Sequence, residues 1–157
     1  CLLIRTKIYK ELGGLDANFF AHQEEIDLCW RINNRFPLAI AYFPFSTIYH
    51  VGGATLGYEN PRKTFLNFRN NLLMLRKNLP LSRLWWLMIV RFFMDYLAAV
   101  QMLVTNQTAN AKAVCQARIA YHKMKKQYAI GNIPANPMLS NRSKTARKSR
   151  DNRKGCL

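Results

Sequence analysis

Three carboxylates and a histidine lie close together near the middle of the first 50 residues. Glu24, Glu25 and Asp27 are three of only eight acidic residues in the chain, and His22 precedes them. A carboxylate within reach of a hydroxyl can accept its proton, so this stretch has the residue type of a general base. Acidic side chains are also favoured where a helix begins, by roughly 0.3–1 kcal/mol each, because of the helix dipole. A helix start is therefore the simpler interpretation, and the surrounding sequence must decide between the two.

The spacing of apolar residues around the acids predicts helices alternating with short strands. Helices are predicted over residues 6–12, from Glu24 to about residue 35, over 61–78 and over 111–128. Short runs of apolar and aromatic residues predict strands at residues 2–4, 38–43 and 46–50. Together these elements predict a chain that mixes helices with short strands. Because the chain begins with Cys1 inside a predicted strand, we expect it to be a piece of a longer protein.

The charge is divided unevenly along the chain. Residues 1–60 carry five basic and six acidic side chains, whereas residues 61–157 carry nineteen basic and two acidic ones. Such a cationic segment suits an anionic surface: membrane lipid, nucleic acid or a phosphorylated substrate. Nucleic acid is not expected as a partner, because no aromatic residue for base stacking follows Tyr128. The four cysteines have no paired spacing, which argues against a zinc site or disulfide framework and fits a reducing compartment.

The apolar run Leu84–Val104 is long enough to span a membrane. Its ten Leu, Ile, Phe and Val residues favour insertion by about 3–6 kcal/mol, and Arg91 and Asp95 oppose it by about 5–7 kcal/mol. These two charges are four residues apart, so they are expected to pair on one helix face. We predict a helix that lies in the membrane interface with Trp85 and Trp86 at headgroup depth. A helix packed in a protein core is the alternative.

Several short motifs occur in an order and spacing that resemble family 2 glycosyltransferases of the GT-A fold. They are Gly13-Gly14-Leu15-Asp16, Phe19-Phe20, Glu24-Glu25-Ile26-Asp27-Leu28-Cys29-Trp30-Arg31, His50-Val51-Gly52-Gly53-Ala54-Thr55 and the segment from Phe65 to Leu72. The likeness covers roughly residues 1–80 and is greatest to bacterial rhamnosyltransferase-like members that build cell-surface polysaccharide. The resemblance implies an α/β fold, the C-terminal part of a Rossmann-like GT-A domain, followed by a helical, membrane-associating extension.

The resemblance also assigns roles to individual residues. It implies that Glu25, with Glu24 beside it, is the catalytic base, although the family usually has Asp at this position and Tyr at the position of His22. It implies that His50 is a ligand of a divalent metal, Mg or Mn. It places the acceptor or the diphosphate near a further set of residues: His22, Asp27, Gly52, Gly53 and Arg69. A structural pairing with Arg31 is the alternative for Asp27, and a solvated helix face is the alternative for Arg69.

The chain differs from the family in two respects. The Asp-x-Asp motif that shares the metal is absent, and so is the nucleotide-binding half that should precede Cys1. We therefore expect a truncated fragment that is inactive alone, with a degenerate homologue as the alternative. The expected domains are an acceptor-side catalytic part, a helical membrane-associating region and a basic disordered tail, at residues 1–80, 81–130 and 131–157.

The predicted function is inverting transfer of a sugar from a UDP- or dTDP-linked donor to a saccharide or polyprenyl-linked acceptor. The predicted location is the cytoplasmic face of the bacterial inner membrane, as a peripheral or monotopic protein on an anionic lipid surface. The alternative function is a non-catalytic, basic adaptor that binds membrane or RNA.

Overall fold

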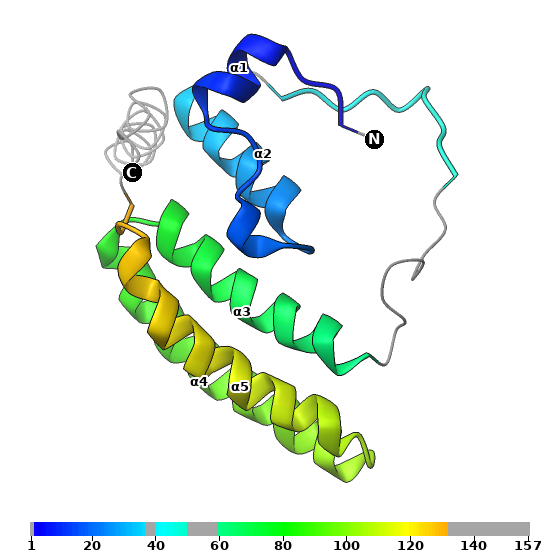
Figure 1. The fold of residues 1–157 in the computed structure, drawn as a ribbon, viewed down its shortest axis with the longest axis vertical. Coiled ribbons are helices and arrows are strands. Elements are labelled where there is room, and N and C mark those ends of the chain that lie inside the picture. Colours follow the sequence, from blue (N-terminus) through cyan, green and yellow to red (C-terminus); the bar gives the residue numbers. More distant parts are fainter. Residues whose placement is uncertain (1, 37–39, 50–59, 132–157) are drawn as a thin grey trace, which may run out of the picture.

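The computed structural model describes residues 2–36, 40–49 and 60–131. Figure 1 shows long neighbouring helices α3, α4 and α5, with α2 next to α3 and α1 farther from α3. In chain order the elements are α1 (Thr6–Glu11), the 3₁₀ turn η1 (Ala17–Phe19), α2 (Glu24–Arg35), α3 (Pro61–Asn78), α4 (Leu81–Val104), α5 (Thr108–Met124) and the 3₁₀ turn η2 (Lys125–Gln127).

The predicted helices are confirmed, with ends that follow from local chemistry. Helix α1 ends at Glu11 and is followed by Gly13 and Gly14, whose φ angles of 76° and 68° suit glycine after a helix C-terminus. Helix α3 begins at Pro61, and the side chain of Asn60 accepts a hydrogen bond from the Arg62 amide. Pro80 separates α3 from α4, because proline lacks the amide hydrogen needed to continue a helix.

The prediction of an α/β fold is wrong. Helices and 3₁₀ turns are the only regular elements in the part of the chain that the structure describes. Residues 2–4, 40–43 and 46–49 have no strand assignment, and residues 38–39 and 50 of the predicted strands lie outside the described ranges. A strand forms only where a neighbour supplies ladder hydrogen bonds, so the strand-like composition of these segments was insufficient. The observed helical architecture does not fit a Rossmann-like GT-A domain.

The apolar core lies where α3 meets the elements that flank it. Leu72 and Leu73 of α3 are fully buried, and Met74 is nearly so. They form one cluster with three aromatic side chains from elsewhere in the chain: Phe19, Tyr121 and Tyr128. Helix α3 therefore packs on two sides, against the turn that precedes α2 and against α5.

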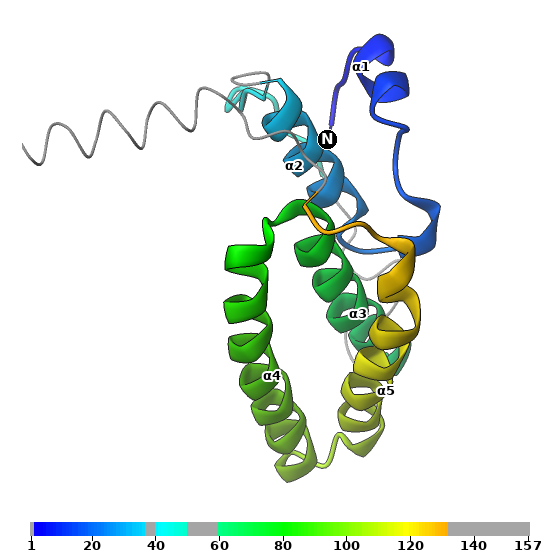
Figure 2. The ribbon, with the colours of Figure 1, turned by 90° about the vertical axis from the view of Figure 1, so that its left-hand side faces the viewer.

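Helices α4 and α5 form an antiparallel hairpin (Figure 2). The predicted pairing of Arg91 with Asp95 is confirmed at 2.7 Å, and Arg118 of α5 contacts the same carboxylate at 2.7 Å. Asp95 is fully buried and faces α5 through this contact. Two arginines thus compensate the one acidic residue of α4, which offsets the cost of removing its charge from water.

The rest of α4 is mainly exposed and apolar. Only Leu84, Asp95 and Ala99 are buried along its length. Trp85 and Trp86 are 56% and 57% exposed, and the exposed set continues with Ile89, Val90, Phe92, Phe93, Met94, Tyr96, Leu97, Val100, Leu103 and Val104. Among the described helices, α4 is the one that is long and apolar enough to associate with a membrane, by length and composition. It is not a core helix within the described part of the chain.

A polar junction joins α2 to α3. The fully buried carboxylate of Asp27 on α2 accepts hydrogen bonds from Arg31 at 2.9 Å, Lys77 at 2.9 Å and Asn78 at 2.7 Å. Lys77 also contacts Asp16 at 2.9 Å, so one ammonium group links Asp16, which precedes η1, to Asp27 of α2. Burial alone would raise the pKa of Asp16, but the hydrogen bond and charge of Lys77 hold that pKa below its ordinary value.

We predict that Lys77→Met destabilises the fold by about 3 kcal/mol, because it leaves the buried carboxylate of Asp27 without its cation from α3. The free energy of unfolding in urea measures the change. Lys112→Met is the matched control, since Lys112 is exposed on α5 and should change stability by less than about 0.5 kcal/mol. Equal stability of the two variants would contradict the importance of the junction.

Candidate functional site

The predicted catalytic acids, Glu24 and Glu25, stand where a tight turn leads into α2. We call residues 19–25 the acid turn. Its backbone is unusual, because Phe20, His22 and Gln23 have φ angles of 63°, 68° and 74°. Positive φ is uncommon outside glycine and is a genuine outlier for a bulky residue such as Phe. Strain of this kind costs of order 1–3 kcal/mol per residue and is kept only where surrounding contacts enforce it.

Asn70 of α3 supplies the enforcing contacts. Its side chain is fully buried, and its amide nitrogen lies 2.8 Å from the Phe19 carbonyl, 2.8 Å from the Ala21 carbonyl and 2.9 Å from the His22 carbonyl. The two amide hydrogens are shared among these three acceptors. One side chain thus holds three carbonyls of the acid turn and connects them to the middle of α3.

Arg69 orients the Asn70 amide. Its Nε and Nη2 atoms donate to Asn70 Oδ1 at 2.9 and 2.8 Å, so the oxygen and nitrogen of that amide cannot exchange places without losing these bonds. Nη2 also donates to the Asn18 and Phe19 carbonyls at 2.9 and 3.3 Å. Burial lowers the pKa of Arg69 from its ordinary value. Arg69 therefore stabilises the acid turn, and its contact with a diphosphate stays a prediction.

The two acids of the acid turn differ in solvent exposure. Glu25 is exposed in the first turn of α2, whereas Glu24 is partly buried. Among the described residues, Glu24 Oε2 and His22 Nε2 are buried polar atoms without a hydrogen-bond partner. Unsatisfied buried polar atoms are rare in proteins and require an explanation. Strain, an accessible carboxylate and two unpaired polar atoms therefore occur together in one short segment.

Asp27 has a different environment from its two acidic neighbours. Its predicted contact with Arg31 is present at 2.9 Å, and its carboxylate is shielded from solvent by the polar junction. Arg31 extends further and donates to the carbonyls of Leu12 and Gly14 at 2.6 and 2.7 Å. These bonds connect α2 to the residues that follow α1. The geometry supports a structural role for Asp27 rather than contact with an acceptor.

The predicted metal site falls largely outside the described residues. His50, Gly52 and Gly53 are not in the described ranges. Within those ranges, no three His, Cys, Asp or Glu side chains are grouped so that they could hold a metal ion. The residues on view therefore do not make up the metal site that the resemblance implies, and no chemical step is derived through a metal.

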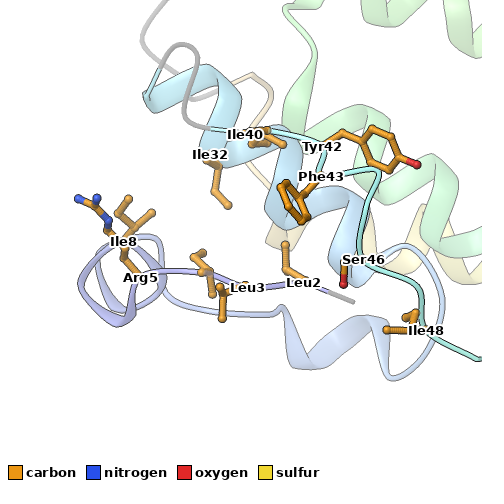
Figure 3. Close-up of a pocket in the computed structure, with 12 residues that line it drawn as sticks. Leu2, Leu3, Arg5, Ile8, Ile32, Ile40, Tyr42, Phe43, Ser46 and Ile48 are labelled. Carbon is orange, nitrogen blue, oxygen red and sulfur yellow. The ribbon is translucent and has the colours of Figure 1, made fainter.

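A separate cavity of about 1150 Å³ lies between the N-terminal segment, α2 and residues 40–48. Figure 3 shows Leu2, Ile32 and Phe43 directed into this space. Arg5 is the one charged residue among the residues that line it, and none of them is a carboxylate. The lining consists of Leu2, Leu3, Ile4, Arg5, Ile8, Ile32, Ile40, Ala41, Tyr42, Phe43, Ser46 and Ile48. The cavity is therefore suited to apolar contact and not to proton transfer.

The sequence interpretation did not assign a role to Asn70, Lys77 or Asn78. A signal was present, because Asn70 and Asn78 are eight residues apart and interrupt the apolar face that includes Leu66 and Leu73. A polar side chain on the buried face of a helix needs a partner, and such a residue is a candidate for a specific long-range hydrogen bond.

Comparisons of the chain with protein-family models, with curated proteins and with solved structures gave no match. The resemblance to family 2 glycosyltransferases therefore stays a prediction from short motifs. Two features of the described residues bear on function: the acid turn and the exposed apolar face of α4.

We predict that Asn70→Ala loosens the acid turn and destabilises the protein by roughly 2 kcal/mol, because buried carbonyls lose their donor. Hydrogen exchange of the amides in residues 19–25 should accelerate, and urea unfolding should shift to lower denaturant. Asn71→Ala is the control, since it removes the same side chain one position away from the contact. Unchanged exchange in Asn70→Ala would show that the turn is held by other means.

Proposed function

We propose that this chain contributes the catalytic base of an inverting glycosyltransferase that works at a membrane surface. The observation that carries the proposal is the exposed carboxylate of Glu25 on the strained, hydrogen-bonded acid turn. A general base must be reachable by its substrate and held at a fixed position. Exposure of Glu25 supplies the first condition, and the contacts of Asn70 and Arg69 with the turn support the second.

In the proposed reaction, a hydroxyl of a saccharide or polyprenyl-linked acceptor attacks the anomeric carbon of a UDP- or dTDP-linked sugar. As the new carbon–oxygen bond forms, the bond from that carbon to the nucleotide diphosphate breaks. Glu25 takes the hydroxyl proton, because a sugar hydroxyl is a poor nucleophile until a base accepts it. A divalent metal, where bound, would neutralise charge on the diphosphate. His22 and Glu24 flank the base.

We predict that Glu25→Gln lowers kcat for sugar transfer by about 100-fold or more, with little change in KM for the donor, because only proton acceptance is lost. Transfer is measured with the native protein in its own membranes, by incorporation of labelled sugar into acceptor. Glu11→Gln is the control, since Glu11 is exposed on α1 and its closest cation, Arg35, is 3.9 Å away. Wild-type transfer by Glu25→Gln would rule out this assignment.

The proposed location is the cytoplasmic face of the bacterial inner membrane, with α4 lying in the plane of the lipid interface. Helix α5 runs back along α4 and exposes Lys112, Gln116 and Lys123 on its outer side. If α4 crossed the bilayer, α5 would carry these polar groups into hydrocarbon at a cost of several kcal/mol. An in-plane arrangement lets the apolar face of α4 enter the lipid while α5 stays in water.

We predict that the double substitution Phe93→Asp and Leu97→Asp weakens binding to phosphatidylglycerol-containing vesicles by at least about tenfold, because it places carboxylates on the inserting face. Co-sedimentation with vesicles measures binding. Leu3→Asp is the control, since Leu3 is 97% exposed but lies outside α4. A wild-type chain that stays in solution with these vesicles would contradict the membrane location.

A second candidate function is a non-catalytic module that binds membranes. The exposed apolar face of α4 favours it without any reference to Glu25. The two functions make different predictions. Vesicle binding by the wild type together with unimpaired transfer by Glu25→Gln would favour the non-catalytic module, and loss of transfer in that variant would favour the glycosyltransferase.

A further inference from the structure

Phe20 is the most unusual residue of the acid turn. Its neighbour Phe19 is completely buried in the core cluster, whereas Phe20 is 64% exposed. Its φ and ψ angles of 63° and −59° lie outside the regions that a bulky residue normally adopts. The chain therefore keeps a large apolar ring in water on a strained backbone. Neither burial nor helix formation explains why an aromatic side chain stands at this position.

The fold holds Phe20 in this conformation from both sides. Asn70 contacts the carbonyls of Phe19 and Ala21, the residues immediately before and after it. Fixing both neighbours limits how far the backbone of Phe20 can rotate to bury the ring. The exposed ring thus stands on a backbone that hydrogen bonds from Asn70 hold on both sides.

Arg62 provides a cation beside the exposed ring. Its guanidinium carbon lies 4.7 Å from the centroid of the Phe20 ring, at a distance typical of a cation–π contact. Arg62 is exposed in the first turn of α3, and that turn contains no acidic residue. Among the described residues, no salt bridge neutralises it. An exposed aromatic ring therefore adjoins a guanidinium that has no carboxylate partner among the described residues.

We propose that Phe20 and Arg62 form a binding site for a phosphorylated sugar. The apolar face of a pyranose ring packs on the Phe20 ring, and the guanidinium of Arg62 binds the phosphate through paired N–H donors. Phe20 belongs to the same turn as Glu25, whose side chain is also exposed. In the proposed transferase, which this part of the inference assumes, the bound molecule is the acceptor.

The site is tested first by direct binding to the full chain. The probes are glucose 1-phosphate, glucose alone and inorganic phosphate, each followed by ligand-observed NMR. We expect glucose 1-phosphate to bind more tightly than either part, because ring and guanidinium act together. Phe20→Ala should weaken this binding by about tenfold, which corresponds to 1.4 kcal/mol, and Phe20→Trp should retain it. Arg62→Met should abolish the preference for the phosphorylated sugar.

Matched controls separate the site from general effects. Phe45→Ala removes an aromatic side chain that is 85% exposed outside the acid turn, and it should bind glucose 1-phosphate like the wild type. Urea unfolding of each variant checks that the fold is intact. Vesicles that contain polyprenyl-phosphate glucose, compared with the soluble probe, show whether the site takes a lipid-linked or a free sugar phosphate.

The inference is overturned if wild-type protein shows no preference for glucose 1-phosphate, or if Phe20→Ala binds it as tightly as the wild type. The result is independent of the proposed reaction. Binding that depends on Phe20 and Arg62 while Glu25→Gln transfers sugar normally would refute the catalytic base and keep the site. Loss of transfer in Glu25→Gln with binding unaffected by Phe20→Ala would do the reverse.

Discussion

The arrangement of this protein depends on one buried carboxylate. Asp27 accepts hydrogen bonds from Arg31 in its own helix and from Lys77 and Asn78 in α3. A carboxylate removed from water is costly unless its lone pairs are all satisfied by well-placed donors, so few relative positions of the two helices are acceptable. This requirement sets the position of α2 along α3. Asn70 lies about two turns before Asn78 on α3, and with α2 in this position its side chain reaches the carbonyls that precede α2.

Helix α3 performs two tasks with different faces. Its polar residues bind the acid turn and Asp27 in the first turn of α2, while its leucines pack with Tyr121 of α5. Helix α5 in turn carries Arg118, which reaches Asp95 of the exposed helix α4. The acid turn and the apolar surface are therefore connected through packed helices and not through a loop. In the proposed function, this connection fixes the height of the catalytic base above the lipid.

Local patterns predicted much of this fold, and long-range contacts account for the rest. Helix bounds followed from periodicity and from Pro and Gly, and the pairing of Arg91 with Asp95 followed from helical spacing. Arg118 could not be placed beside Asp95, because twenty-three residues separate them and only the hairpin brings them together. The strand predictions failed for a related reason. A strand depends on its neighbour, and composition alone does not supply one.

The candidate site was predictable only in part. The acids of the acid turn were identified from their cluster, but the contacts that make the turn rigid come from Asn70, some fifty residues away. The different environments of Glu25 and Asp27 also depend on α3, since Lys77 and Asn78 cover one carboxylate and not the other. A sequence motif indicates which residues gather near a site, and tertiary packing decides which of them stays accessible.

The last described residue of the chain has a consequence for electrostatics. The Gly131 amide donates to the Arg76 carbonyl at 3.3 Å, and a side chain there would collide with the Leu79 carbonyl, 2.6 Å from the position of a Cβ atom. Gly131 thus lies beside Pro80, at the N-terminal end of α4. Residues 132–157 carry seven Lys and Arg side chains and one acid. The sequence that follows Gly131 is thus strongly basic, and it is covalently joined to a residue that lies at the N-terminal end of α4, the helix that carries both indoles.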